Sequence, residues 1–139
     1  MINKRKYAVV ASIVFLLTAV AAVLIRLEAV RPFENLRAED IASVRISLQS
    51  PDAVVLIEDE ARIAEIAGVI ITVITYEKSD EWQDYVGQSA AFTLTMKSGE
   101  ETEIVAYNPF VIINGQGYKA EYEPCENLSS VANRTLNDR

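Results

Sequence analysis

Acidic side chains form the densest group of residues that could do chemistry. Glu77, Asp80, Glu81 and Asp84 fall within a stretch of eight residues, and carboxylates clustered on a loop could ligate Ca²⁺ through their oxygens. The spacing does not match an EF-hand, because no Gly lies at the turn position and no Glu closes a twelve-residue loop. We therefore expect a solvated loop that binds no metal.

Histidine-dependent chemistry is excluded by composition, because the sequence contains no His. Ser-His-Asp and Cys-His catalysis need an imidazole, and so do most zinc and copper sites. A pair of carboxylates could act as general acid and base, but 20 acids on a small surface form close pairs by chance. Nothing marks a functional pair, so we expect no catalytic residue, no cofactor and a protein that is not an enzyme.

Five aromatic residues are candidates for ligand contact: Trp82, Tyr85, Tyr107, Tyr118 and Tyr122. Of these, Trp82 and Tyr85 are the candidates for a ligand or partner surface. They lie three residues apart in the polar stretch 76–88, which we expect to be a loop and which is an unusual place for such side chains. Two interpretations stay open. The rings can fold back over the edge of the predicted sheet, which we favour, or they can form a binding surface for a peptide or glycan.

A single cysteine, Cys125, lies at the predicted start of the last helix. A helix N-terminus lowers the pKa of a thiol, whereas the acids Glu123 and Glu126 beside it raise that pKa. We expect a packed, inert thiol, with an intermolecular disulfide as the alternative. One cysteine cannot form an internal disulfide, so the domain must depend on its hydrophobic core.

All of these residues follow one long apolar run, Ala8–Ile25, AVVASIVFLLTAVAAVLI. Its eighteen residues carry no charge, and as a helix they cover about 27 Å, close to the ~30 Å hydrocarbon thickness of a bilayer. Lys4, Arg5 and Lys6 precede the run, and a mixed set of charges follows it. The positive-inside rule then predicts a single-pass protein with a cytoplasmic N-terminus and an extracytoplasmic remainder.

A cleaved secretory signal is the competing interpretation of this run. Ala19-Val20-Ala21 has the small-residue pattern of a cleavage site. We favour an uncleaved anchor, because the run stays apolar up to Ile25, where a mature N-terminus is usually polar. The predicted organisation is a cytoplasmic tail (1–7), a transmembrane anchor (8–27), a stalk (28–38) and an extracytoplasmic domain (39–139).

Alternating apolar residues after position 39 predict one α+β domain. Strands are predicted over 41–48, 53–57, 91–97, 103–107, 110–113 and 118–122, with turns that include 49–52 and 114–117. Asp59 is the expected N-cap of a helix over 60–75, whose β-branched end could instead be a strand. Pro124 suits the first turn of a closing helix. The order β-β-α-β-β-β-β-α predicts an antiparallel sheet of about five or six strands with helices on one face.

Charge is divided unevenly along the chain. All 20 acids follow residue 27, so residues 8–139, with 10 basic residues, carry a formal charge of −10. This acidity opposes nucleic-acid binding. We therefore expect a membrane-anchored extracytoplasmic binding domain with a protein or cell-envelope partner. The alternatives are an accessory subunit that acts through its transmembrane helix on a membrane complex, and a small carboxylate-dependent cell-envelope hydrolase.

Three stretches carry a resemblance to known proteins: IASVRISL, AVVLIEDEARIAEI and AAFTLTMKSGEETEIVAY. They contain a strand, a second strand that leads into an acidic helix cap, and a later hairpin. In this order the chain resembles small, singly anchored extracytoplasmic proteins of Gram-positive bacteria whose function is unknown. The resemblance covers most of the predicted domain and implies its location and fold, but it implies no functional residues.

Overall fold

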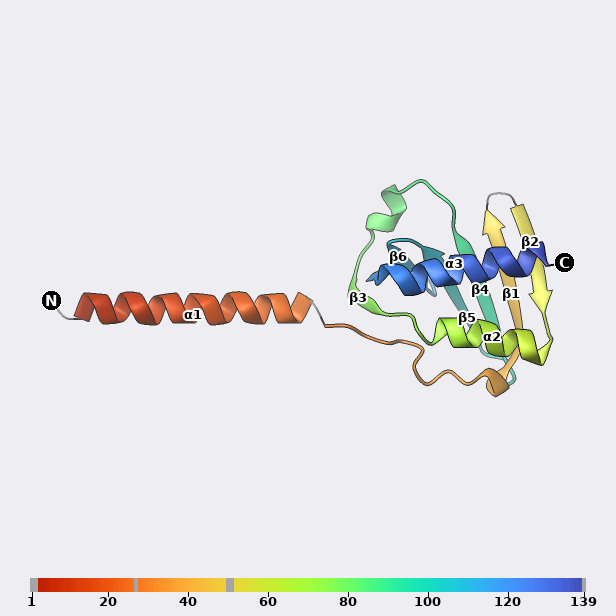
Figure 1. The fold of residues 1–139 in the computed structure, drawn as a ribbon, viewed down its shortest axis with the longest axis horizontal. Coiled ribbons are helices and arrows are strands. Elements are labelled where there is room, and N and C mark those ends of the chain that lie inside the picture. Colours follow the sequence, from red (N-terminus) through yellow and green to blue (C-terminus); the bar gives the residue numbers. More distant parts are fainter. Residues whose placement is uncertain (1–2, 27, 50–51, 139) are drawn as a thin grey trace.

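The structure, a computed structural model, describes residues 3–26, 28–49 and 52–138. A long helix, α1 (Asn3–Arg26), extends away from a domain in which a sheet packs against two helices (Figure 1). Part of the predicted turn at 49–52 and the last residue of the predicted anchor, Leu27, lie outside the described residues. The remaining elements are η1 (Ala38–Asp40), β1 (Ile41–Gln49), β2 (Asp52–Ile57), α2 (Glu60–Ile70), β3 (Thr75–Lys78), η2 (Glu81–Asp84), β4 (Ala90–Met96), β5 (Glu101–Tyr107), β6 (Phe110–Ile113), β7 (Gln116–Ala120) and α3 (Tyr122–Asn137).

The apolar run forms one continuous helix, α1, that is long and apolar enough to span a membrane over Asn3–Leu24. None of that window is buried against the rest of the chain. Its hydroxyl groups bond to the helix itself, since Ser12 Oγ donates to Ala8 O at 2.9 Å and Thr18 Oγ1 donates to Val14 O at 2.9 Å. A secretory signal sequence has the same length and polarity, so both interpretations of the run are consistent with this helix.

The domain is built on a seven-stranded antiparallel sheet with the order β2-β1-β4-β5-β6-β7-β3. β1 and β2 form the predicted hairpin, with Val44 opposite Ile57. Between β6 and β7, Asn114 and Gly115 both have positive φ, as a tight turn of this hairpin type requires. The predicted α+β fold is therefore confirmed, with seven strands in place of five or six.

Both domain helices cover the same face of the sheet, as predicted, and lie side by side (Figure 1). Asp59 is the N-cap of α2, where its side chain accepts from Arg62 N at 3.0 Å. Completely buried side chains fill the space between helices and sheet, and burying each stabilises the fold by roughly 1.5–3 kcal/mol. The largest are Phe92, Ile46, Ile66, Ile70, Leu94, Ile104 and Leu128.

The chain from Ile71 to Lys78 differs from the predicted helix and loop. α2 ends at Ile70 rather than near Thr75, and a turn follows it. Thr75–Lys78 then joins the sheet as β3, with Thr75 opposite Ala120. The prediction of helix up to residue 75 was therefore wrong in its last turn, and so was the prediction of a loop at 76–78. The β-branched run leads into a strand because an edge of β7 is available for pairing.

The segment predicted as a stalk is in contact with the domain. Val30 and Thr75 exchange two backbone hydrogen bonds, of 2.8 and 2.9 Å, so Val30 lies along the outer edge of β3. Phe33 and Leu36 are half-buried and pack against the core. The chain after α1 is therefore held against the sheet within a few residues of the helix end.

Candidate functional site

The sheet face opposite the helices carries a second buried patch. Along β6, Val111 faces the helices and belongs to the core, so its neighbours Phe110 and Ile112 face the other way. Both of these side chains are buried, although neither belongs to the core. Residues 79–89, which connect β3 to β4 and include η2, lie over this face. We call this segment the covering loop.

Trp82 holds the covering loop against β7. A Cβ atom at Gly117 would lie 2.3 Å from Trp82 Cδ1 and 2.4 Å from Ser79 O, so this close approach requires glycine. Ser79 N donates to Gly117 O at 3.0 Å. Trp82 Nε1 is buried without a hydrogen-bond partner among the described residues, so packing rather than hydrogen bonding holds the ring. Trp82 therefore folds back over the sheet.

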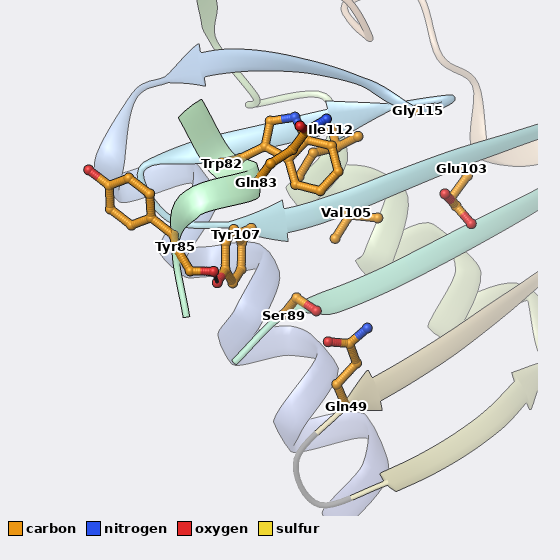
Figure 2. Close-up of a pocket in the computed structure, with 10 residues that line it drawn as sticks. All are labelled: Gln49, Trp82, Gln83, Tyr85, Ser89, Glu103, Val105, Tyr107, Ile112 and Gly115. Atoms are coloured by element: carbon orange, nitrogen blue, oxygen red, sulfur yellow. Dashed lines mark hydrogen bonds between the residues drawn. The ribbon is translucent and has the colours of Figure 1, made fainter. Parts of the chain in front are cut away.

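Tyr85 fixes the far end of the covering loop. Its ring meets Phe110 edge-on, with ring centroids 5.1 Å apart and planes inclined by 76°. Tyr107 Oη donates to the backbone carbonyl of Tyr85 at 2.5 Å. Figure 2 shows the rings of Tyr85 and Trp82 on different sides of η2, with the Tyr85 ring pointing away from the other labelled side chains. The two residues therefore contribute separately, and a shared ligand surface stays a prediction.

A pocket of about 350 Å³ lies beside the covering loop (Figure 2). This volume is within the range of small-molecule sites. Five parts of the chain contribute to its wall: the end of β1, the covering loop, β5, β6 and the turn before β7. The lining residues are Gln49, Trp82, Gln83, Tyr85, Ser89, Glu103, Val105, Tyr107, Ile112 and Gly115.

The lining combines an apolar surface with groups that form hydrogen bonds. Val105 and Ile112 supply aliphatic surface, while the amides of Gln49 and Gln83 can each donate and accept hydrogen bonds. Glu103 is the sole charged residue among the described lining residues. An anionic ligand would find no counter-charge here, so the pocket suits an uncharged or cationic ligand with polar groups.

Sequence reasoning identified Trp82, Tyr85 and Tyr107 but missed the glutamines, Ser89 and Glu103 of the wall. Gln49 and Ser89 are far apart in the sequence and approach because β1 pairs with β4, Leu48 lying opposite Ala90. The alternation of β5 offered one signal, since it places Glu103, Val105 and Tyr107 on the face opposite Ile104. That signal gives the face but not the strand order that brings these residues together.

The acids at 77–84 do not line this pocket. Glu77 lies in β3 and forms an ion pair with Lys119 at 3.2 Å, while Glu81 and Asp84 belong to η2. Within residues 3–26, 28–49 and 52–138, no three His, Cys, Asp or Glu side chains form a group that could hold a metal ion. The structure therefore offers no geometry for the calcium site that we considered.

Cys125 lies in the first turn of α3 and is buried. Its Sγ donates to Phe110 O at 3.4 Å. Burial raises the pKa of the thiol from an ordinary value near 9 to about 12, and the negative charge of Glu126 adds to the rise. The predicted packed thiol is confirmed, and its position excludes a disulfide with another molecule in this folded state.

Comparison of the chain with protein-family models, with curated proteins and with solved structures finds no match.

Proposed function

We propose that the protein is a membrane-anchored binding domain that acts outside the cytoplasmic membrane and holds its ligand in the pocket beside the covering loop. The observation that carries this proposal is the site itself, a concave region with aromatic, aliphatic and amide side chains. It lies on the sheet face opposite the hydrophobic core. A ligand can therefore occupy it without disturbing the packing of α2 and α3.

The distribution of charge supports the proposed location. Lys4, Arg5 and Lys6 belong to the first turns of α1, and all 20 acids of the sequence lie beyond residue 27. Basic residues beside a membrane span favour the cytoplasmic side, so this asymmetry supports an extracytoplasmic domain.

The lining of the pocket supports binding rather than hydrolysis. Hydrolysis of a glycosidic bond by carboxylates needs two of them on opposite sides of the bond, one as acid and one as base or nucleophile. Among the described lining residues Glu103 is the sole acid. A single carboxylate beside amides is suited to orienting a ligand through hydrogen bonds.

The test uses Trp82, the single tryptophan of the sequence, as a reporter in the pocket wall. Full-length protein in nanodiscs is titrated with neutral cell-wall saccharides, with basic peptides and with acidic peptides. We expect a saturable change in tryptophan emission with a neutral or basic ligand and none with an acidic one. Failure of the whole panel to change the emission would overturn the proposed site.

A matched pair of variants locates the binding. Ser89→Leu places a larger side chain in the pocket wall, whereas Ser98→Leu makes the same change in the turn between β4 and β5. We expect Ser89→Leu to weaken binding at least tenfold and Ser98→Leu to leave it unchanged. Equal binding by both variants would place the ligand elsewhere.

The location is tested separately on intact cells. Protease added outside should cut within residues 39–139 before the cells are lysed. Protection of these residues until lysis would invert the proposed topology.

A further inference from the structure

Exposed apolar side chains gather at the end of the domain that lies nearest to α1. Val30 is 50% exposed, Ile71 36% and Tyr122 65%. We call these three residues the anchor-side patch. In Figure 1, β3 and the start of α3 lie at the end of the domain from which α1 extends.

Backbone contacts bring the three residues of the patch together. Val30 pairs with Thr75 in β3, four residues after Ile71. Glu121, the neighbour of Tyr122, donates its N–H to Ile74 O at 2.9 Å. A shallow depression bordered by residues that include Arg31, Ile71, Ile74 and Pro124 joins the same segments. The patch is therefore a fixed part of the folded domain rather than a feature of a flexible linker.

The length of the connection places this patch close to the end of α1. Only residues 27–29 separate Arg26, the last residue of α1, from Val30. Four extended Cα–Cα steps span at most about 14 Å. The interfacial layer on each side of a bilayer is roughly 5–8 Å thick. If α1 spans the bilayer, Val30 must lie in or just above the lipid headgroups, and the backbone contacts through Thr75 and Ile74 hold Ile71 and Tyr122 beside it.

We infer that the anchor-side patch rests in the lipid–water interface and that its partner is an uncharged or zwitterionic lipid surface. The inference rests on the proposed function in one respect, because α1 must be retained and must span the bilayer. Tyr122 has the side chain most typical of this layer, with an apolar ring and a polar hydroxyl. Val30 and Ile71 add aliphatic surface that leaves water on contact with lipid.

Charges around the patch determine which lipids it fits. Within four residues of the patch, Glu28, Glu34, Glu121 and Glu123 are exposed, and Arg31 is the one exposed base among the side chains that the structure describes there. Anionic headgroups would repel these carboxylates, whereas zwitterionic headgroups would not. The contact is therefore closest on phosphatidylcholine and is loosened by anionic lipid at low salt.

Spin-label depth measurements on the full-length chain test this inference. Single cysteines are introduced by Ile71→Cys and Tyr122→Cys in a Cys125→Ala background, and the protein is reconstituted in phosphatidylcholine nanodiscs. Val54 and Leu56, which are 58% and 52% exposed on β2 at the other end of the sheet, provide matched controls as Val54→Cys and Leu56→Cys. A label at Val14→Cys, in the middle of α1, reports on insertion of the helix.

The readout is the ratio of label collisions with oxygen to collisions with a water-soluble nickel chelate, which rises with depth in the bilayer. We expect labels at positions 71 and 122 to give a ratio several-fold above the controls, and anionic lipid to lower it. Values equal to the controls, with a deeply inserted label at position 14, would overturn the contact while leaving the anchor intact. A water-exposed label at position 14 would instead overturn the anchor and the inference together.

Discussion

The two faces of the sheet are covered by different kinds of structure. One face lies under α2 and α3 and forms a continuous core of completely buried side chains such as Phe92 and Leu128. The other face is covered over β6, β7 and the end of β5, by a loop that Trp82 and Tyr85 hold in place. Towards β2 that second face is open, and Val54 and Leu56 are exposed there.

This difference separates the residues that stabilise the whole domain from those that line the proposed binding site. The helix-covered face supplies most of the buried apolar surface, so changes there should act on the whole domain. The loop-covered face depends on a few contacts, and its pocket is lined by polar groups that do not belong to the core. Changes on this face should act on the covering loop and on the proposed binding before they act on global unfolding.

The largest expected effect is on the helix-covered face. Phe92→Ala removes a completely buried ring and should lower the free energy of unfolding by about 3–5 kcal/mol, in urea unfolding followed by circular dichroism. Thr93 follows Phe92 and points to the opposite face of the sheet, so Thr93→Ser is the control. It should change the free energy of unfolding by less than about 1 kcal/mol. Similar losses in the two variants would contradict the assignment of the core to one face.

Alkaline pH should weaken the same face through Cys125. Because burial raises the pKa of this thiol from near 9 to about 12, the unfolded chain loses the proton first as pH rises. Stability from this group is complete below about pH 9 and should fall by roughly 1 kcal/mol per pH unit between pH 9 and 12. Urea unfolding of the wild type and of Cys125→Ala between about pH 8 and 12 measures this loss of stability. A free energy of unfolding that falls equally with pH in both proteins would refute the contribution of Cys125.

On the loop-covered face, Gly117→Ala should displace the covering loop. The new Cβ would meet Trp82 and the Ser79 carbonyl, and we expect a loss of about 1–3 kcal/mol with a red shift of the tryptophan emission. Gly68→Ala in α2 is the control, since nothing lies within 4 Å of its added Cβ, and it should stabilise by about 0.5–1 kcal/mol. An unshifted emission in Gly117→Ala would show that Trp82 does not pack on this strand.

The smallest expected effect is local. Tyr107→Phe removes the hydrogen bond to the Tyr85 carbonyl and should destabilise the covering loop by about 0.5–1.5 kcal/mol. Hydrogen exchange should accelerate within residues 79–89, with little change in the core strands. Tyr122→Phe, with an exposed ring, should leave exchange in the loop unaltered. Faster exchange throughout the sheet would show that the two faces unfold as one cooperative unit.

What the sequence could predict also differs between the two faces of the sheet. Period-two alternation predicted β1 and β4, because one side of each strand enters a core that sequence can identify. β3 was missed because its residues are polar and its strand conformation comes from pairing with β7 and Val30. Trp82 was identified because an aromatic residue is unusual in a polar loop. The need for glycine at position 117, by contrast, depends on a contact between distant segments. Sequence patterns alone do not contain that contact.

The open side of β2 has a practical consequence for anyone who prepares this domain in quantity. Ala53–Ile57 is a row of five aliphatic residues whose backbone N–H and C=O groups have no neighbouring strand beyond β1 among the described residues. Strands of this kind template growth by stacking onto one another, and natural proteins interrupt them with charge. A lysine introduced at Val54 should therefore keep concentrated samples free of fibrils without touching the helix-packed interior.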